Sequence, residues 1–334
     1  MRALFSVIPR FSFVIPAKAG IQSFFILLLY LASSSVCAEP QPVYVGVYLN
    51  DIINVDLKSN TYVADFYLWF KWQGKEDPSS TFEFVNAFEK WTHMAQKVYE
   101  TPQVKNGWKY QVLHVNGSFH HPFLLNDYPL DEQKIMISIE DSLKNGEGLN
   151  YVADTSSSSF RKEIKIPGWE IKNQEVKSYP YTYPTNFGLD EGKKSEQYSR
   201  LEYNVTILRH KKLYLFKMLL PIFIVLLCAL VIYFISPVYS DSRLALCITA
   251  LVSAVAMHIT VSADLPSVGY LVLIDKIYNL SYLTIFLSLA ETVFIIYLKD
   301  KGQLNLAEKM DKISLLCITS FFVISCIALV SFRI

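Results

Sequence analysis

The spacing of hydrophobic residues divides the chain into two parts. Between residues 39 and 209, short runs alternate apolar and polar side chains, as in Tyr62–Phe70 and Gln133–Ile139. Such alternation predicts strands with one buried face, because successive side chains of a strand point to opposite sides. Clusters of turn-forming residues separate the runs, at 145–148, 156–159 and 167–168. We expect residues 39–209 to form an immunoglobulin-like antiparallel β-sandwich.

Four long apolar stretches follow Arg209, at about 213–235, 243–263, 270–298 and 313–332. A helix rises ~1.5 Å per residue, so about 20 apolar residues cross the hydrocarbon core of a bilayer. Pro221 lies inside the first stretch, where neighbouring helices can satisfy the freed backbone carbonyl. We expect residues 210–334 to form a four-helix transmembrane bundle. The whole chain is then a multi-domain α+β membrane protein with a soluble ectodomain.

The first 38 residues have the pattern of a secretion signal. Basic residues precede an apolar run at 24–32, and small residues follow up to Ala38. This order predicts cleavage before Glu39. An uncleaved anchor helix and a lipoprotein attached through Cys37 are the alternatives.

Composition agrees with a membrane protein that has a sizeable soluble part. Hydrophobic residues make up 52% of the chain and charged residues 18%, and the net charge of +1 gives no reason to expect a nucleic-acid partner. An even number of spans places both mature ends on one side of the membrane, and a secreted sandwich makes that the periplasmic side. The connection between the third and fourth stretches is then cytoplasmic, and it is rich in lysine, as the positive-inside rule expects.

The second apolar stretch carries a polar stripe. Residues three or four positions apart share one helical face here, namely Asp241, Ala245, Thr249, Val252, Ala256, Ile259 and Ala263. Five copies around an axis would form an acidic ring at the cytoplasmic mouth and an apolar constriction further along, the arrangement of a cation-selective pore. Small residues that merely allow close helix packing are the alternative. Arg243 either pairs with a carboxylate on the bundle side or offsets the acidic ring.

Two other ionisable residues lie in the predicted spans. We expect His258 to be buried and hydrogen-bonded away from the proposed pore face. Glu291 is an intramembrane carboxylate, and such groups are costly and often functional. It either makes an interhelical hydrogen bond or lines a modulatory cavity.

The segment His121–Ile135 reads HPFLLNDYPLDEQKI. It resembles the signature loop of the pentameric ligand-gated ion channels, also called Cys-loop receptors. Animal members carry two cysteines fourteen positions apart around a Phe-Pro-x-Asp core, and those positions are His121 and Ile135 here. The chain therefore has the loop without its disulfide, as is usual in the bacterial branch.

Further matches extend this resemblance over about residues 43–330. They are Phe84-Val85-Asn86, Gly168-Trp169-Glu170-Ile171, an arginine twelve residues before Pro221, the run from Arg243 to Thr249, and Leu265-Pro266. Gly269 departs from the bacterial pattern, in which a proline is common.

The resemblance implies a non-enzymatic subunit without cofactor. It would be one copy in a homopentamer that conducts monovalent cations across a lipid membrane, opened by a small agonist bound between ectodomains. Similarity to the amine-gated bacterial channels assigns ligand binding to Tyr67, Asn86, Glu140, Asp141, Tyr183 and Tyr198. A carboxylate among aromatic rings suits an ammonium ion, at ~0.5–2 kcal/mol per ring. Ser142 stands where an aromatic residue is common, so one wall of that cage is missing.

The resemblance also implies a coupling junction between the sandwich and the helices. Asp56, Asp131 and Arg209 should meet there, and the segment from Pro266 to Tyr270 should receive the motion. One guanidinium can bind carboxylates in a bidentate way, which gives directional coupling. Three solvated charges with weak pairing are the alternative.

Other functions stay open at this point. Protons are a second candidate agonist, because His114, His120 and His121 can titrate near neutrality. A membrane-anchored periplasmic sensor that does not conduct is disfavoured by the polar pore face. A membrane enzyme is disfavoured because no acid, base and nucleophile cluster along the sequence, and we expect neither a catalytic nor a metal site.

Overall fold

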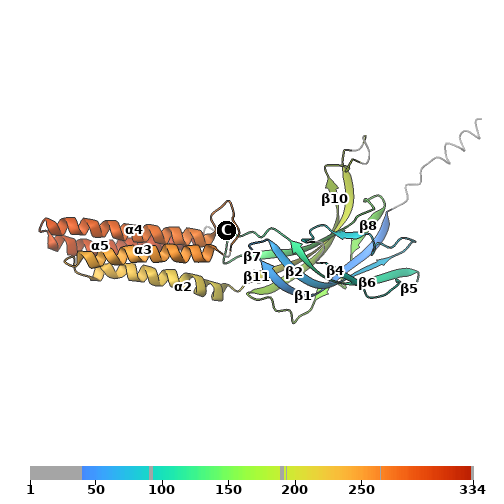
Figure 1. Cartoon of the computed structure of the whole chain (residues 1–334), viewed down its shortest axis with the longest axis horizontal. Coiled ribbons are helices and arrows are strands. Elements are labelled where there is room, and N and C mark those ends of the chain that lie inside the picture. Colours follow the sequence, from blue (N-terminus) through green and yellow to red (C-terminus); the bar gives the residue numbers. More distant parts are fainter. Residues whose placement is uncertain (1–39, 90–92, 189–191, 193, 264, 332–334) are drawn as a thin grey trace, which may run out of the picture. The chain divides into compact units, whose positions relative to one another are not determined.

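Two β-sheets form the N-terminal part of the protein and helices form the rest (Figure 1). The computed structural model describes residues 40–331 apart from 90–92, 189–191, 193 and 264. The predicted signal segment, residues 1–38, lies outside the described residues.

The larger sheet has seven strands in the order β4-β6-β2-β1-β8, with β5 beside β6 and β9 beside β1. These strands are β1 (Gln41–Asp56), β2 (Thr61–Trp72), β4 (Met94–Lys97), β5 (Gln103–Lys105), β6 (Trp108–His120), β8 (Leu149–Ala153) and β9 (Ser159–Phe160). The predicted antiparallel pairing holds for β1, β2, β4, β5 and β6, whereas β8 and β9 each pair with β1 in parallel.

The smaller sheet has the order β10-β11-β7-β3 and is antiparallel throughout. Its strands are β3 (Phe82–Phe84), β7 (Glu132–Asp141), β10 (Trp169–Tyr183) and β11 (Glu196–Arg209). Leu201 of β11 pairs with Ile139 of β7, and this register decides which side chains meet in the candidate site.

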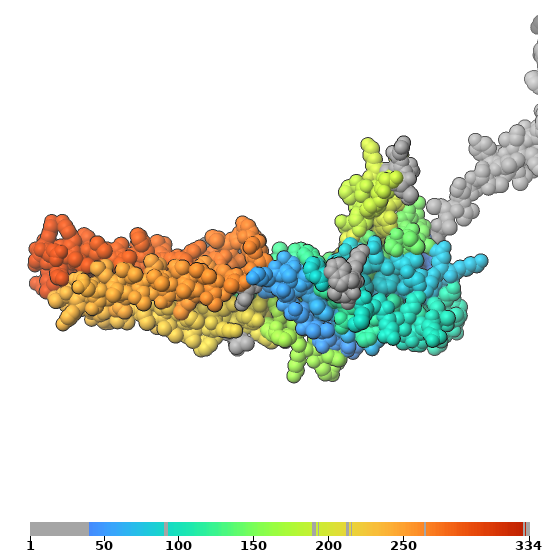
Figure 2. Space-filling model, viewed as in Figure 1, coloured from blue at the N-terminus to red at the C-terminus, as the bar shows by residue number. Residues whose placement is uncertain are grey.

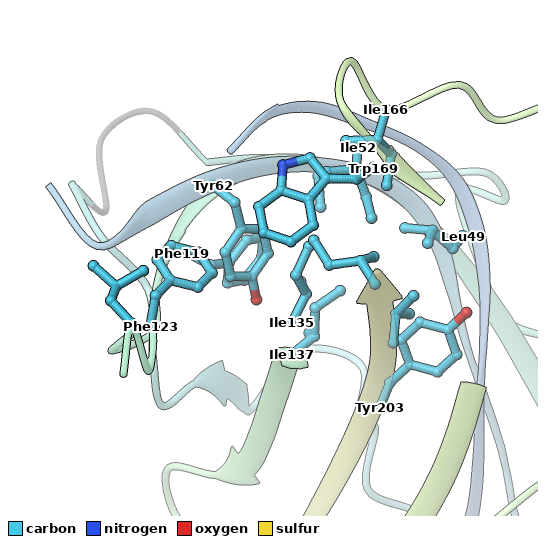
Figure 3. Packing of buried hydrophobic residues seen from close by; sticks show 14 of the residues in the cluster. Leu49, Ile52, Tyr62, Phe119, Phe123, Ile135, Ile137, Ile166, Trp169 and Tyr203 are labelled. Atoms are coloured by element: carbon cyan, nitrogen blue, oxygen red, sulfur yellow. The ribbon is translucent and has the colours of Figure 1, made fainter. Parts of the chain in front are cut away.

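Alternating residues of both sheets fill the core between them. Val45, Val47 and Leu49 of β1 are buried, as are every second residue of β2 and of β7. Figure 3 shows Tyr62, Phe119 and Ile135 gathered in this cluster, where the rings of Tyr62 and Phe119 stack at 5.6 Å. Apolar packing of this kind stabilises the sandwich, since the free cysteines of the described chain all lie in the helical part.

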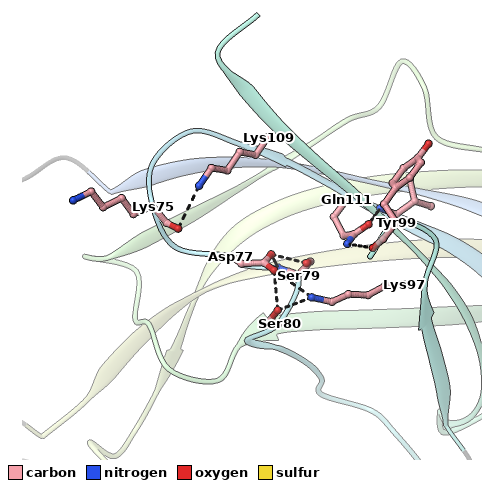
Figure 4. Close-up of polar contacts among 9 residues, drawn as sticks. Lys75, Asp77, Ser79, Ser80, Lys97, Tyr99, Lys109 and Gln111 are labelled. Carbon is pink, nitrogen blue, oxygen red and sulfur yellow. Dashed lines mark hydrogen bonds and ion pairs between the residues drawn. The ribbon is translucent and has the colours of Figure 1, made fainter. Parts of the chain in front are cut away.

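A polar turn fixes an edge of the larger sheet (Figure 4). The carboxylate of Asp77 accepts hydrogen bonds from the Ser79 amide at 3.0 Å, the Ser80 hydroxyl at 2.8 Å and the Lys97 ammonium at 3.2 Å. Burial works to raise the pKa of Asp77, but these hydrogen bonds outweigh it and lower that pKa. Lys97 belongs to β4, so the turn ties this short edge strand to the chain that follows β2.

Four helices, each long and apolar enough to cross a membrane, make up the C-terminal part. They are α2 (Lys211–Leu230) with the short helix η2 (Val231–Phe234), α3 (Ser240–Ser262), α4 (Leu273–Asp300) and α5 (Leu304–Ser331). The predicted bounds agree within a few residues, except that α5 begins at Leu304 rather than near 313. The charged segment before 313 is amphipathic. Its Ala307 and Asp311 are buried, so the helix continues through it.

A buried ion pair joins α3 to α5. Arg243 is only 1% exposed, and its two terminal nitrogens bind the two carboxylate oxygens of Asp311, one of them at 3.1 Å. A carboxylate oxygen of Glu291 on α4 lies 3.8 Å from the same guanidinium. Of the two alternatives for Arg243, the structure therefore selects the pairing on the bundle side.

Replacing Asp311 by Asn should destabilise the helix bundle. The change leaves the buried guanidinium of Arg243 without its main counterion, which costs about 3–5 kcal/mol. Thermal unfolding of the full-length protein in detergent measures this. The control is Asp300→Asn, an exposed carboxylate at the end of α4 whose loss should change little. Equal melting temperatures for the two variants would contradict the assignment.

Candidate functional site

The predicted pore face of α3 is solvent-exposed in the single chain. Asp241, Ala245, Thr249, Val252, Ala256, Ile259 and Ala263 are all exposed. Val252 is 63% exposed and Ile259 is 67% exposed. The buried residues of α3 lie on another side of the helix: Ser240, Arg243, Cys247, Ala250 and Ala254. Figure 2 shows part of the surface of α3, in orange, beside that of α2, in yellow. One side of α3 thus packs against its own bundle and leaves the polar stripe available.

His258 joins α3 to the beginning of α4. Its two ring nitrogens lie 2.9 Å from the hydroxyl of Tyr282 and 3.0 Å from a carboxylate oxygen of Asp275. The ring also stacks on Tyr278 at 4.7 Å. Asp275 in turn accepts the backbone N–H of Val272, so it caps the helix as well as binding the histidine. His258 is hydrogen-bonded and off the proposed pore face, as the sequence predicts, but its side chain is 21% exposed and so only partly buried.

The predicted coupling residues Asp131 and Arg209 form a buried bidentate pair. Nε and one terminal nitrogen of Arg209 lie 2.6 and 3.0 Å from the two oxygens of Asp131. Both residues are at most 4% exposed. The guanidinium carbon also lies 4.0 Å from the ring centroid of Trp169 and 4.9 Å from that of Tyr214. Such a pair fixes the end of β11, just before α2, against the loop that precedes β7.

Asp56 takes another position in the same region. Its carboxylate accepts the backbone N–H of Lys58 at 2.9 Å and of Ser59 at 3.4 Å, and hydrogen bonding to Ser59 is the main cause that lowers its pKa. Asp56 and Arg209 line one cavity of about 980 Å³. No hydrogen bond or ion pair joins them in the described part of the chain. The predicted contact of all three residues is therefore not formed: Arg209 pairs with Asp131, and Asp56 caps a separate turn beside them.

Backbone contacts connect this junction to α3 and α4. The first N–H groups of a helix have no partner within the helix. Two of those of α4, on Leu273 and Ile274, donate to the carbonyls of Asn126 and Tyr128 at 3.1 and 3.2 Å. The ammonium of Lys58 donates to the carbonyl of Ala263 at 3.2 Å. Sequence reasoning assigned the receiving role to the segment from Pro266 to Tyr270, and the hydroxyl of Tyr270 does accept the backbone N–H of Leu125 at 3.1 Å. It missed the contact with α4, because backbone carbonyls leave no sequence signal.

A pocket of about 830 Å³ brings together four of the six predicted ligand residues, Glu140, Asp141, Tyr183 and Tyr198. They come from β7, β10 and β11 of the smaller sheet. The rings of Tyr183 and Tyr198 meet edge to face at 5.8 Å, and Phe187 lies 5.3 Å from Tyr183. The pocket thus offers aromatic faces next to carboxylates, the combination that favours a cation.

Asp141 has a structural task in this pocket. It is 1% exposed, and one oxygen accepts the backbone N–H groups of Leu143 and Lys144 at 3.0 and 2.8 Å. The other oxygen accepts the hydroxyl of Thr81. The carboxylate therefore holds the loop after β7 in place.

Glu140 is bound by Arg200, a residue that sequence reasoning missed. Nε of Arg200 donates to Glu140 at 2.6 Å, and the hydroxyl of Tyr183 donates to its other oxygen at 3.0 Å. Burial, followed by the hydrogen bond to Glu140, raises the pKa of Tyr183 to about 12, so this donor stays protonated. Only the register of β7 against β11 places Arg200 opposite Glu140, and the sequence alone does not specify that register.

Tyr67 and Asn86 lie outside this pocket. Tyr67 belongs to β2 of the larger sheet, where its ring stacks on His114 at 4.6 Å. Asn86 donates to the carbonyl of Met136 at 2.6 Å and accepts the N–H of Ser138 at 3.1 Å, so it links its loop to β7. Within one chain neither residue reaches Glu140, and only a second copy can add Tyr67.

A β-sandwich followed by four apolar helices is the layout of a pentameric ligand-gated channel subunit. Comparison with known proteins agrees with this fold. The chain is a distant homologue, 21% identical over 311 residues, of a proton-gated ion channel from Gloeobacter violaceus, and the match covers 88% of this chain and 84% of that protein. No protein-family model matches the chain. The protein is thus a multi-pass membrane protein with an ion channel among its relatives.

Proposed function

We propose that this chain is the subunit of a homopentameric ligand-gated ion channel of the bacterial inner membrane, with the sandwich in the periplasm. One observation carries the proposal. The polar stripe of α3 is exposed, while the other side of the helix is buried in its own bundle. Five copies turned toward a common axis would line a water path with this stripe. The Asp241 ring at its inner end favours cations, and the apolar residues Val252 and Ile259 form the constriction.

The agonist in this proposal is a small organic ammonium ion in the pocket of Glu140, Tyr183 and Tyr198. Tyr67 of an adjacent copy would close the pocket, since it comes from the opposite sheet of the sandwich. The contacts of β11 and of the loop before β7 then transmit the movement. Arg209 and Asp131 join these two segments, and the loop holds the first turn of α4.

Cysteines introduced along α3 should separate the pore from the bundle. In a background without the four cysteines of the helices, Val252→Cys and Ile259→Cys should lose most of their current when a water-soluble thiol reagent is added. Ala254→Cys is the matched control, because Ala254 is buried on the bundle side of the same helix. Recordings in a planar bilayer measure the effect. Block at Ala254 but at neither of the other positions would refute the pore assignment.

Replacing Arg209 by Ala should abolish agonist-evoked current while the subunits still assemble. The variant leaves Asp131 without the guanidinium that ties it to β11, at a cost of about 3–5 kcal/mol in that contact. Size-exclusion chromatography checks assembly, and bilayer recording checks gating. Lys172→Ala is the control, since Lys172 makes an exposed pair with Glu132, next to Asp131, at 2.9 Å. Wild-type current from the Arg209 variant would show that Arg209 is not required for coupling.

Protons are the second candidate agonist, favoured by the proton-gated relative and by the position of His121. Burial, and then the charges of His120 and Lys134, lower the pKa of His121 below its ordinary value of 6.5. The imidazole is therefore neutral in this folded state at pH 7. As pH falls below 6.5, states that release the ring and let it protonate gain stability relative to this one.

Replacing His121 by Gln should therefore shift acid-evoked current to lower pH. Gln cannot take up the proton that favours the released state, so part of the driving force disappears. Current measured over a pH series without any amine is the test. His210→Gln is the control, because His210 is an exposed histidine that is not among the causes of the lowered His121 pKa. If both variants kept the wild-type pH dependence, His121 would have no part in an acid response.

A further inference from the structure

The guanidinium of Arg200 is a buried, paired charge next to the ligand pocket. It lies on β11, directly across from Glu140 on β7, and its side chain is 10% exposed. Nε donates to one Glu140 oxygen at 2.6 Å, and a terminal nitrogen donates to the Tyr183 hydroxyl at 2.9 Å. The Tyr183 hydroxyl in turn donates a hydrogen bond to the second Glu140 oxygen at 3.0 Å. Every oxygen of Glu140 is thus engaged by Arg200 or by its tyrosine partner.

Aromatic rings complete the surroundings of this guanidinium. Its central carbon lies 3.5 Å from the ring centroid of Tyr181 and 5.9 Å from that of Tyr183. A carboxylate with tyrosine faces around it is the environment that recognises an organic ammonium ion. In this chain the side chain of Arg200 lies in such an environment, between Glu140 and the tyrosine rings.

The charges show how firmly Arg200 is held. Burial alone would lower the pKa of Arg200, but the hydrogen bond and the charge of Glu140 outweigh this and raise it. The guanidinium therefore stays charged and neutralises Glu140. An amine that enters the pocket therefore meets a Glu140 carboxylate that is already paired. Of the other carboxylates that line the pocket, Asp141 binds the backbone of its loop and Glu196 accepts a hydrogen bond from the Asn145 side chain, and Glu83 is the third.

A second basic residue of the same hairpin provides a comparison. Lys177 on β10 binds Glu202 at 3.1 Å and lies 5.3 Å from the ring of Tyr179, so it repeats the cation, carboxylate and tyrosine pattern. The Lys177 side chain is 42% exposed, and neither Lys177 nor Glu202 lines the pocket. Pairing of this kind therefore also occurs away from the pocket, and of these two examples only Arg200 shares its carboxylate with the pocket wall.

We propose that Arg200 is a built-in cation that occupies the agonist subsite in the resting protein, and that an organic ammonium ion binds by displacing it from Glu140. This inference rests on the proposed function for the location of the pocket. Displacement removes a side-chain tie between β7 and β11 and frees the β10–β11 hairpin to move. Arg200 also sets specificity, since only ligands that replace its hydrogen bond to Glu140 compete with it.

Binding of n-butylamine to the full-length protein in detergent tests this inference by isothermal titration calorimetry at pH 7. Arg200→Gln should tighten binding roughly tenfold or more, since buried charge pairs of this kind couple strongly. Lys177→Gln should leave the affinity unchanged. The gain should vanish in the double variant with Glu140→Gln. Unchanged or weaker binding by Arg200→Gln, or no binding by either protein, would overturn the inference.

Rescue by a small cation distinguishes displacement from a general loosening of the hairpin. In Arg200→Ala, millimolar guanidinium chloride should refill the subsite and return the apparent amine affinity toward the wild-type value. Sodium chloride at equal concentration is the control, and equal effects of the two salts would overturn the proposal. If Arg200→Gln does not assemble, Arg200→Lys serves instead and should tighten binding by a smaller factor in the same direction. No change in affinity with Lys would count against the proposal.

These measurements do not depend on conduction. If Arg200→Gln binds the amine more tightly but the protein never conducts in a bilayer, the inference about Arg200 is supported and the proposed channel function is contradicted. If the protein conducts in response to another stimulus and substitution of Arg200 does not change amine binding, the channel function is supported and the inference about Arg200 is contradicted.

Discussion

The buried pair of Arg243 and Asp311 fixes the orientation of α3, and the proposed pore depends on that orientation. Arg243 stands two residues after Asp241, so the two side chains lie on different sides of the helix. Drawing the guanidinium into the bundle turns the carboxylate outward. A charge buried without a partner is very costly, so α3 cannot rotate far without breaking this contact. The positive charge also stays off the face on which Asp241 would form its ring.

A continuous series of contacts leads from the candidate ligand pocket to the same helix. Strand β11 carries Arg200 near one end and Arg209 at the other, each bound to a carboxylate at an end of β7. The loop before β7 holds the first turn of α4, and Asp275 in that turn binds His258 of α3. Each link is a hydrogen bond or ion pair, so a shift of β11 has a physical route to α3. Coupling along this route is a proposal that the Arg209 variant addresses.

The sequence predicted what depends on local periodicity. Apolar runs located the four helices, and three- and four-residue spacing found the face of α3 that is exposed. It missed the beginning of α5, because charges hid an amphipathic turn around Ala307. It also missed Arg200, whose partner is set by strand register, and the backbone contacts of α4, which no side chain reveals. Tyr67 belongs to the other sheet, so its proposed role requires a neighbouring copy that one chain cannot supply.

The permeability ratio of cations to anions tests the central claim, that α3 lines a shared water path, most directly. It is obtained from the reversal potential of the reconstituted protein in a salt gradient, for the wild type and for Asp241→Lys. Cation preference is expected in the wild type, and in the variant the reversal potential should shift toward the equilibrium potential of the anion. The same reversal potential for both proteins would contradict this claim, because Asp241 would then lie away from the ions.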